Sequence, residues 1–167
     1  SKFIPVTPRG LRNIHYRGAT DVVAQYVVNN PSSRIFSGKS LILGGSHAPN
    51  YNLPGTLVGD LSAILIENCP SLINKFRVPG KDIALLSDFE EKMDRIATLT
   101  SGMNITNISG VPSWMMAVLK HMLEITGKNS VEELWPNLEV FFHGGVAFTP
   151  YREQYKQIIR KSDMKYM

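Results

Sequence analysis

Three glycine-containing turns, each placed directly after a short apolar run, are where this sequence could do chemistry. The first follows residues 40–43 and contains His47, the second is Gly110-Val111-Pro112-Ser113-Trp114, and the third is His143-Gly144-Gly145-Val146. Consecutive glycines have no Cβ atoms, so a flat ligand can lie directly against their backbone. The pattern favours a small-molecule site, although paired glycines also make ordinary tight turns and Trp114 also fits a core stripe on a helix.

Other motifs that could indicate a catalytic or binding site are incomplete in this sequence. Gly38-Lys39-Ser40 copies the end of a phosphate loop, but Ser33 stands where that motif needs its first glycine. The histidines have no close spacing to one another or to Cys69, so we predict no metal site. No acid-base pair can be assigned from spacing, and we therefore assign no catalytic residue. The histidines are His15, His47, His121 and His143.

Composition narrows the class of protein. With 43% hydrophobic and 19% charged residues, the 167-residue chain is typical of one globular domain. Its net charge of +4 is scattered, which argues against a nucleic-acid partner. The longest apolar runs, residues 61–66 and 114–119, are far shorter than the ~18 residues of a membrane span. A single cysteine, Cys69, and the lack of a leader favour the cytoplasm.

The elements that must position the turns alternate between strands and helices. This order predicts an α/β fold with a largely parallel sheet and helices on both faces. Parallel sheets bind ligands beyond the carboxyl ends of their strands, so the three turns should meet at one edge. We expect strands at residues 2–6, 40–43, 104–108, 138–142 and 164–167, and helices at residues 8–29, 57–67, 70–76, 87–101, 114–126 and 149–160.

Local signals set several of these boundaries. Thr7-Pro8 is a typical helix start, and Thr149-Pro150 repeats it. Ser87 and Glu90 have the spacing of a capping box. Gly127 should end its helix in the left-handed conformation. We interpret residues 44–49 as a polar turn that carries His47.

Read in order, these landmarks resemble the auxin-responsive acyl acid amido synthetase family and its bacterial relatives. That family lies within the adenylate-forming superfamily of acyl-CoA synthetases and luciferases. The resemblance covers essentially the whole chain, and the order and spacing of its motifs are more specific than any one of them. The motifs are Lys2-Phe3-Ile4-Pro5-Val6-Thr7, Ile108-Ser109-Gly110-Val111-Pro112-Ser113-Trp114, Leu134-Trp135-Pro136-Asn137-Leu138 and His143-Gly144-Gly145.

The resemblance implies roles for particular residues. Lys2 matches the tail of the family's phosphate loop, and His143, Gly144, Gly145 and Val146 match its adenine-binding segment. His47 and the run from Gly110 to Trp114 would line the acyl-substrate pocket. Residues 1–167 would be the central part of a larger N-terminal adenylation domain, inactive by itself. The phosphate loop, the Tyr-x-x-Ser-Glu element and the C-terminal domain would lie outside it.

The implied activity is that of an ATP-dependent ligase. A carboxylic acid is adenylated with ATP and Mg²⁺, and the amine of an amino acid then displaces AMP to give an amide. Two alternatives stay open: an acyl-CoA ligase that shares the adenylation step, and a non-catalytic α/β binding module. The implied partners are small carboxylic acids and amino acids.

Overall fold

The structure is a computed structural model, and it describes residues 3–167. By its internal contacts the chain divides into two compact units, residues 1–33 and residues 34–167. The first unit is helical. The second contains the sheet and all the predicted site residues except Lys2, which lies outside the described residues.

The helix of the first unit confirms the prediction for residues 8–29. It runs through α1 (Pro8–Gly10), a π-helical segment η1 (Leu11–Tyr16) and α2 (Arg17–Asn29). The Thr7 hydroxyl accepts a hydrogen bond from the Gly10 N–H at 3.1 Å, as expected of an N-cap. The predicted strand at residues 2–6 is wrong, because residues 3–6 have no regular structure. No neighbouring strand gives this segment hydrogen-bond partners there.

The second unit is built on a five-stranded, all-parallel sheet with the order β4-β1-β5-β6-β7. This confirms the predicted α/β class and the parallel sheet. The short strand β4 was not predicted, and it belongs to the sheet because it pairs with β1. The strands are β1 (Lys39–Ile42), β4 (Arg77–Val78), β5 (Ile105–Gly110), β6 (Val140–His143) and β7 (Lys165–Tyr166).

One row of paired residues crosses all five strands. The register places Val78 beside Leu41, Leu41 beside Ile108, Ile108 beside Phe141, and Phe141 beside Tyr166. Leu41, Ile108 and Phe141 are completely buried in the main hydrophobic cluster, at 0% exposed area. Since paired residues in a sheet point to the same face, this row marks the face on which the core is built.

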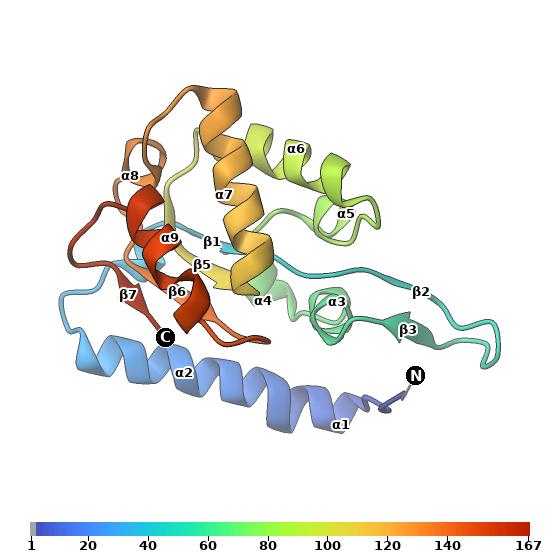
Figure 1. The fold of residues 1–167 in the computed structure, drawn as a ribbon. Helices are drawn as coiled ribbons and strands as arrows, with labels where there is room; N and C mark the ends of the chain where they lie inside the picture. The colour runs from blue at the N-terminus through green and yellow to red at the C-terminus, as the bar shows by residue number, and fades with distance from the viewer. Residues whose placement is uncertain (1–2) are drawn as a thin grey trace. The chain divides into compact units, whose positions relative to one another are not determined.

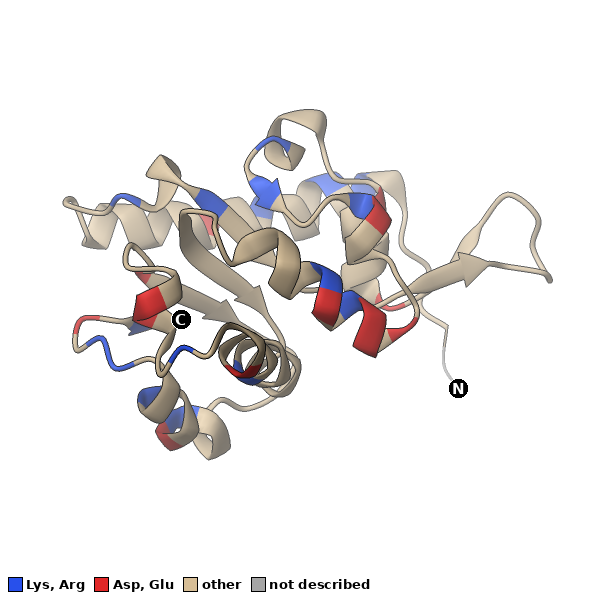
Figure 2. Cartoon of the chain, turned by 90° about the horizontal axis from the view of Figure 1, so that it is seen from above, with Lys and Arg blue, Asp and Glu red and all other residues tan. Residues whose placement is uncertain are grey.

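Helices α6 and α7 lie side by side over this core (Figure 1) and contribute buried residues to it. Figure 2 shows Lys and Arg interspersed with Asp and Glu along the chain's elements. No helix within residues 3–167 has the length and apolar character needed to cross a membrane. The helices of this unit are η2 (Ile35–Ser37), α3 (Leu61–Glu67), α4 (Ser71–Asn74), α5 (Lys81–Ala84), α6 (Phe89–Thr100), α7 (Pro112–Thr126), α8 (Val131–Leu134), η3 (Thr149–Tyr151) and α9 (Arg152–Ile158).

A two-stranded antiparallel arm extends away from the main sheet (Figure 1). It pairs β2 (His47–Pro49) with β3 (Leu57–Gly59). Two predictions are corrected here: His47 lies in a strand and not in a turn, and the helix predicted from residue 57 begins at Leu61. The ladder between the two segments gives their backbone a regular partner that turn-like composition does not reveal.

Several helix ends also differ from prediction. The side chain that caps α6 is Asp88, which accepts the Glu91 N–H at 2.9 Å, and not Ser87. Thr149 starts a 3₁₀ turn without making a side-chain cap. Gly127 does end α7 in the left-handed conformation, with a φ of 66°, as predicted.

The buried row makes a stability prediction. Ile108→Ala removes a fully buried side chain from the centre of the sheet and should lower the free energy of unfolding by about 2–5 kcal/mol. Ile125→Ala, at a position 52% exposed on α7, is the control and should change it by less than about 1 kcal/mol. Urea unfolding followed by circular dichroism measures both, and equal losses would contradict the assigned core.

Candidate functional site

The carboxyl ends of β1, β5 and β6 bring the three glycine turns to one edge of the sheet. The Leu43 N–H donates to the Ser109 carbonyl at 2.9 Å, and the Gly144 N–H donates to the Gly110 carbonyl at 3.3 Å. These bonds continue the parallel pairing past the last residue of β1 and into the turn after β6. The edge is where open parallel sheets place their ligands.

A pocket of about 310 Å³ opens at this edge, beyond the end of β1. Turn, arm and helix residues contribute to its wall, and one of them, Trp114, is a predicted site residue. Its volume is at the lower end of those that hold small-molecule ligands. The lining residues are Gly45, Ser46, Asp60, Ser87, Phe89, Lys92 and Trp114.

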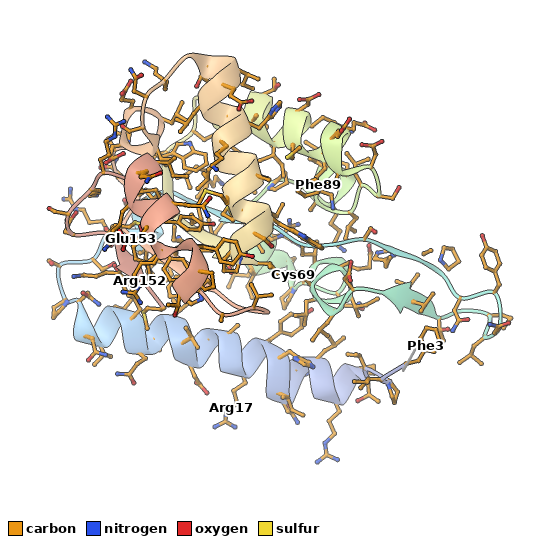
Figure 3. The ribbon with its side chains drawn as sticks, viewed as in Figure 1. Phe3, Arg17, Cys69, Phe89, Arg152 and Glu153 are labelled. Atoms are coloured by element: carbon orange, nitrogen blue, oxygen red, sulfur yellow. The ribbon has the colours of Figure 1, made fainter. Side chains whose placement is uncertain are left out.

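Two aromatic rings form the apolar part of the pocket. Phe89 begins α6 (Figure 3), and its ring centroid lies 6.0 Å from that of Trp114 on α7, with 53° between the ring planes. This spacing and tilt are typical of a favourable aromatic pair. Because α6 and α7 hold the two rings, the pocket has one wall that suits a flat apolar group.

The polar part of the pocket contains a buried ammonium group. Lys92 is only 2% exposed, and its Nζ donates to the Gly44 carbonyl at 3.1 Å and to the Gly45 carbonyl at 3.0 Å. Burial lowers the pKa of Lys92, and the negative charge of Asp60 partly offsets this effect. The side chain therefore carries a cation to the bottom of the turn that follows β1.

Asp60 shapes the same turn from the other side. Its Oδ2 accepts the Ser46 N–H at 3.2 Å, and a Cβ atom on Gly45 would lie only 1.9 Å from this oxygen. Gly45 is thus required by the close approach of the Asp60 carboxylate. The pocket accordingly holds one carboxylate near its rim and one buried ammonium.

At the end of β6, His143 is held by aromatic packing. Its ring stacks on Phe148 with a centroid distance of 4.4 Å, and Phe148 in turn stacks on Tyr166 at 4.8 Å. Burial, with a smaller contribution from the Arg152 cation, lowers the pKa of His143 and keeps the imidazole neutral at pH 7. Figure 3 labels Arg152 on α9, where its guanidinium lies 5.7 Å from the Phe148 ring centroid.

The turn after His143 presents bare backbone. Gly145 has a φ of 84°, which favours glycine, and a Cβ atom there would lie 3.1 Å from the Cγ2 of Val111. A Cβ on Gly144 would meet nothing within 4 Å among the described residues, so its backbone is open. Val146 is 45% exposed beside it. The turn therefore leaves a stretch of backbone without side-chain cover.

His47 is held by a carboxylate at the end of α3. Its Nε2 is 3.2 Å from a carboxylate oxygen of Glu67, whose other oxygen receives Lys81 Nζ at 3.3 Å. Burial raises the pKa of Glu67, but its hydrogen bonds from Lys81 and His47 outweigh this and lower it. His47 does not line the pocket, although its neighbour Ser46 does.

The structure brings together most of the predicted site residues of the second unit. Val111 approaches Gly145, and Pro112 begins α7 two residues before Trp114. The buried Tyr155 hydroxyl donates to the Pro112 carbonyl at 2.8 Å and holds this loop against α9. Ser113 is half-buried on the first turn of α7. Within residues 3–167, no group of three or more His, Cys, Asp or Glu side chains could hold a metal ion.

A second cavity, of about 450 Å³, lies at the opposite edge of the sheet. It is formed around the residues that precede β1, β4 and β5, including Gly38, Phe76 and Asn104. Ligands of parallel sheets bind at the carboxyl edge, so the smaller pocket is the better candidate site.

Comparison with known families gives a clear result. The model of the GH3 family N-terminal domain matches residues 1–164. The chain belongs to the GH3 family. This is the family of auxin-responsive acyl acid amido synthetases, whose members are ATP-dependent ligases, so the resemblance read from the sequence is confirmed. Searches of curated proteins and of solved structures found no match.

Sequence reasoning missed most of the pocket of this GH3 domain. Lys92, Asp60 and Phe89 were not among the predicted site residues, and the turn at Gly45 and Ser46 was noted only as a turn. A signal for Lys92 was present, since it shares one face of its helix with the buried Ile96 and Thr100 at four-residue spacing. A lysine on a core-facing stripe is unusual and marks a site candidate.

The Gly45 contact gives a prediction. Gly45→Ala places a Cβ against the Asp60 carboxylate, and we expect a loss of about 1–3 kcal/mol in the free energy of unfolding. Gly102→Ala is the control, because a Cβ there meets nothing within 4 Å and the φ is not positive. Thermal unfolding of both variants checks this. A Gly45→Ala variant as stable as the parent would contradict the assigned approach of Asp60.

Proposed function

We propose that this GH3 domain forms the acid-binding and adenine-binding part of an ATP-dependent acyl acid amido synthetase. The observation that supports this best is the pairing of two different surfaces at one sheet edge. One is a half-aromatic pocket with a buried ammonium, and the other is bare glycine backbone after β6. An adenylating enzyme needs both, because it must hold an acid next to a nucleotide.

The acid would occupy the pocket beside Trp114, reached past the loop of Gly110, Val111, Pro112 and Ser113. Adenine would lie on Gly144 and Gly145, with Val146 at its exposed side. His143 is neutral and fixed by stacking, which suits it to border a nucleotide base rather than to carry charge. The resemblance assigns Lys2 to the tail of the phosphate loop, and Lys2 lies outside the described residues.

In the proposed reaction, a carboxylate oxygen of the acid attacks the α-phosphorus of ATP, and pyrophosphate leaves. The amine of an amino acid then attacks the acyl carbon of the adenylate, AMP leaves, and an amide forms. Mg²⁺ would neutralise the charge of the phosphates when bound. The chain's own contribution is to orient the two substrates and keep the acid in a water-poor pocket.

The test is exchange of labelled pyrophosphate into ATP by the complete protein that contains this domain. We expect exchange that requires a carboxylic acid, measured across a panel of aromatic and aliphatic acids. Exchange without any acid, or none with any member of the panel, would count against adenylation. Trapping with hydroxylamine would then show whether an activated acyl group is formed.

The acceptor is tested separately. Amide formation with an amino acid, followed by mass spectrometry of the product, supports the amido synthetase. Product formation with coenzyme A alone would identify an acyl-CoA ligase instead, while leaving the adenylation step in place.

A substitution tests the adenine surface. Gly145→Val adds a branched side chain to the bare backbone and should raise the KM for ATP by about tenfold or more, since it blocks close contact with the base. The matched control is Gly127→Val, which also places valine at a positive φ, 66°, but on the open end of α7. The strain should cost both variants about 1–2 kcal/mol of stability. Unchanged ATP kinetics in Gly145→Val would remove this residue from the site.

A further inference from the structure

The ammonium of Lys92 differs in its placement from the other cationic side chains that the structure describes. Lys92 is 2% exposed, and it lines the pocket at the carboxyl edge of β1. The only other Lys or Arg in the buried class within residues 3–167 is Arg77, which donates to the Asn74 side chain and the Pro79 carbonyl and lines neither of the two cavities.

The hydrogen bonds of Lys92 leave part of its capacity unused. An ammonium has three N–H donors, and two of them bond to the carbonyls of Gly44 and Gly45. The third has no acceptor among residues 3–167. No carboxylate of the described chain lies within 4.0 Å of Nζ, although the Asp60 charge acts on it from a longer distance. A buried charge in this state lacks a close counter-ion.

The rest of the pocket indicates what kind of ligand would carry the counter-ion. The paired rings of Phe89 and Trp114 offer an apolar wall across the same cavity of about 310 Å³. A ligand with a carboxylate at one end and a flat apolar body at the other would fill both parts. An isolated phosphate would leave the rings unused.

Resting on the function proposed above, we infer that Lys92 binds the carboxylate of the acyl acid and thereby positions it in the pocket. The two carbonyl bonds hold Nζ in place, so that its remaining N–H can donate to one carboxylate oxygen. The other oxygen stays available for the attack on phosphorus. Lys92 is therefore a substrate-binding residue in this proposal.

A different reading assigns the pocket to the amino acid, with Lys92 on its carboxylate and Asp60 on its ammonium group. The observations favour the acid. Asp60 already accepts the Ser46 N–H, and it approaches Gly45 so closely that the turn fixes its carboxylate in place. The amino-acid reading is kept as an outcome of the experiment.

The experiment measures binding directly, so it does not depend on turnover. Benzoate and its neutral analogue benzamide are titrated into the complete protein, and binding is followed by ligand-observed NMR. We expect the parent to bind benzoate at least tenfold more tightly than benzamide, because only benzoate pairs with the ammonium. Lys92→Met should weaken benzoate binding by about tenfold or more and leave benzamide binding unchanged.

Variants separate this role from a purely structural one. Lys120→Met, on the exposed face of α7, removes a lysine away from the pocket and should change neither ligand. If Lys92→Met does not fold, Lys92→Gln, which keeps a donor for the Gly44 and Gly45 carbonyls without the charge, takes its place. If Lys92 had only a structural role, replacing it would weaken the binding of benzoate and of benzamide by the same factor.

Three results overturn the inference: equal binding of benzoate and benzamide by the parent, unchanged benzoate binding in the Lys92 variant, or Lys92-dependent binding of L-phenylalanine without benzoate. Failure of the proposed function would show in a different measurement, the pyrophosphate exchange. If benzoate binding depends on Lys92 but no acid supports pyrophosphate exchange, the site stands as an acid-binding pocket and adenylation does not.

Discussion

The parallel pairing of β5 with β1 and β6 is the constraint from which the rest of the second unit follows. The row of Leu41, Ile108 and Phe141 fixes the register of the three strands and is buried completely. A shift of one residue would move this apolar row to the face that carries the hydrogen-bonded side chains of Ser40 and Asn107, so the register is strongly specified. The same register determines which residues stand at the strand ends or just beyond them. Gly44, Gly110 and Gly144 reach one edge because Leu41, Ile108 and Phe141 are held side by side.

The edge is completed by helices, which explains why its chemistry comes from distant parts of the sequence. Helix α6 turns its buried face to the core with Ile96 and Thr100, and the same face carries Lys92 to the end of β1. Helix α7 begins at Pro112 directly after β5 and brings Trp114 against Phe89. The packing of α6 and α7 on the core therefore also determines where the pocket residues lie. A change that moves α6 on the sheet also moves the ammonium in the pocket.

Much of the fold could be predicted because its strands and helices are strongly patterned. The strands that lead to Gly44, Gly110 and Gly144 are short apolar runs with helical segments between them. This alternation predicts a parallel sheet. The short β4 was beyond this reasoning, since two residues, Arg77 and Val78, have no period. Residues 57–59 were assigned to a helix because apolar side chains continue into α3, and only pairing with His47–Pro49 makes them a strand. Local propensity gives no information about this pairing partner, which lies elsewhere in the chain.

The candidate site was only half predictable, for a related reason. The glycine turns can be predicted from the sequence because they stand where apolar runs end: Gly110 is the last residue of β5, and Gly144 and Gly145 follow β6. A buried lysine is harder to predict, because a charged residue on a helix usually faces solvent, and only the four-residue spacing to Ile96 and Thr100 indicates otherwise. What buries Lys92 is the depth at which α6 packs, together with two carbonyls that lie 47 and 48 residues away in the chain. Its charge can be maintained there because the turn after β1 points both carbonyl oxygens inward. The same turn thus does two things: Gly45 leaves room for the Asp60 carboxylate, and the backbone carbonyls of the turn hold the ammonium.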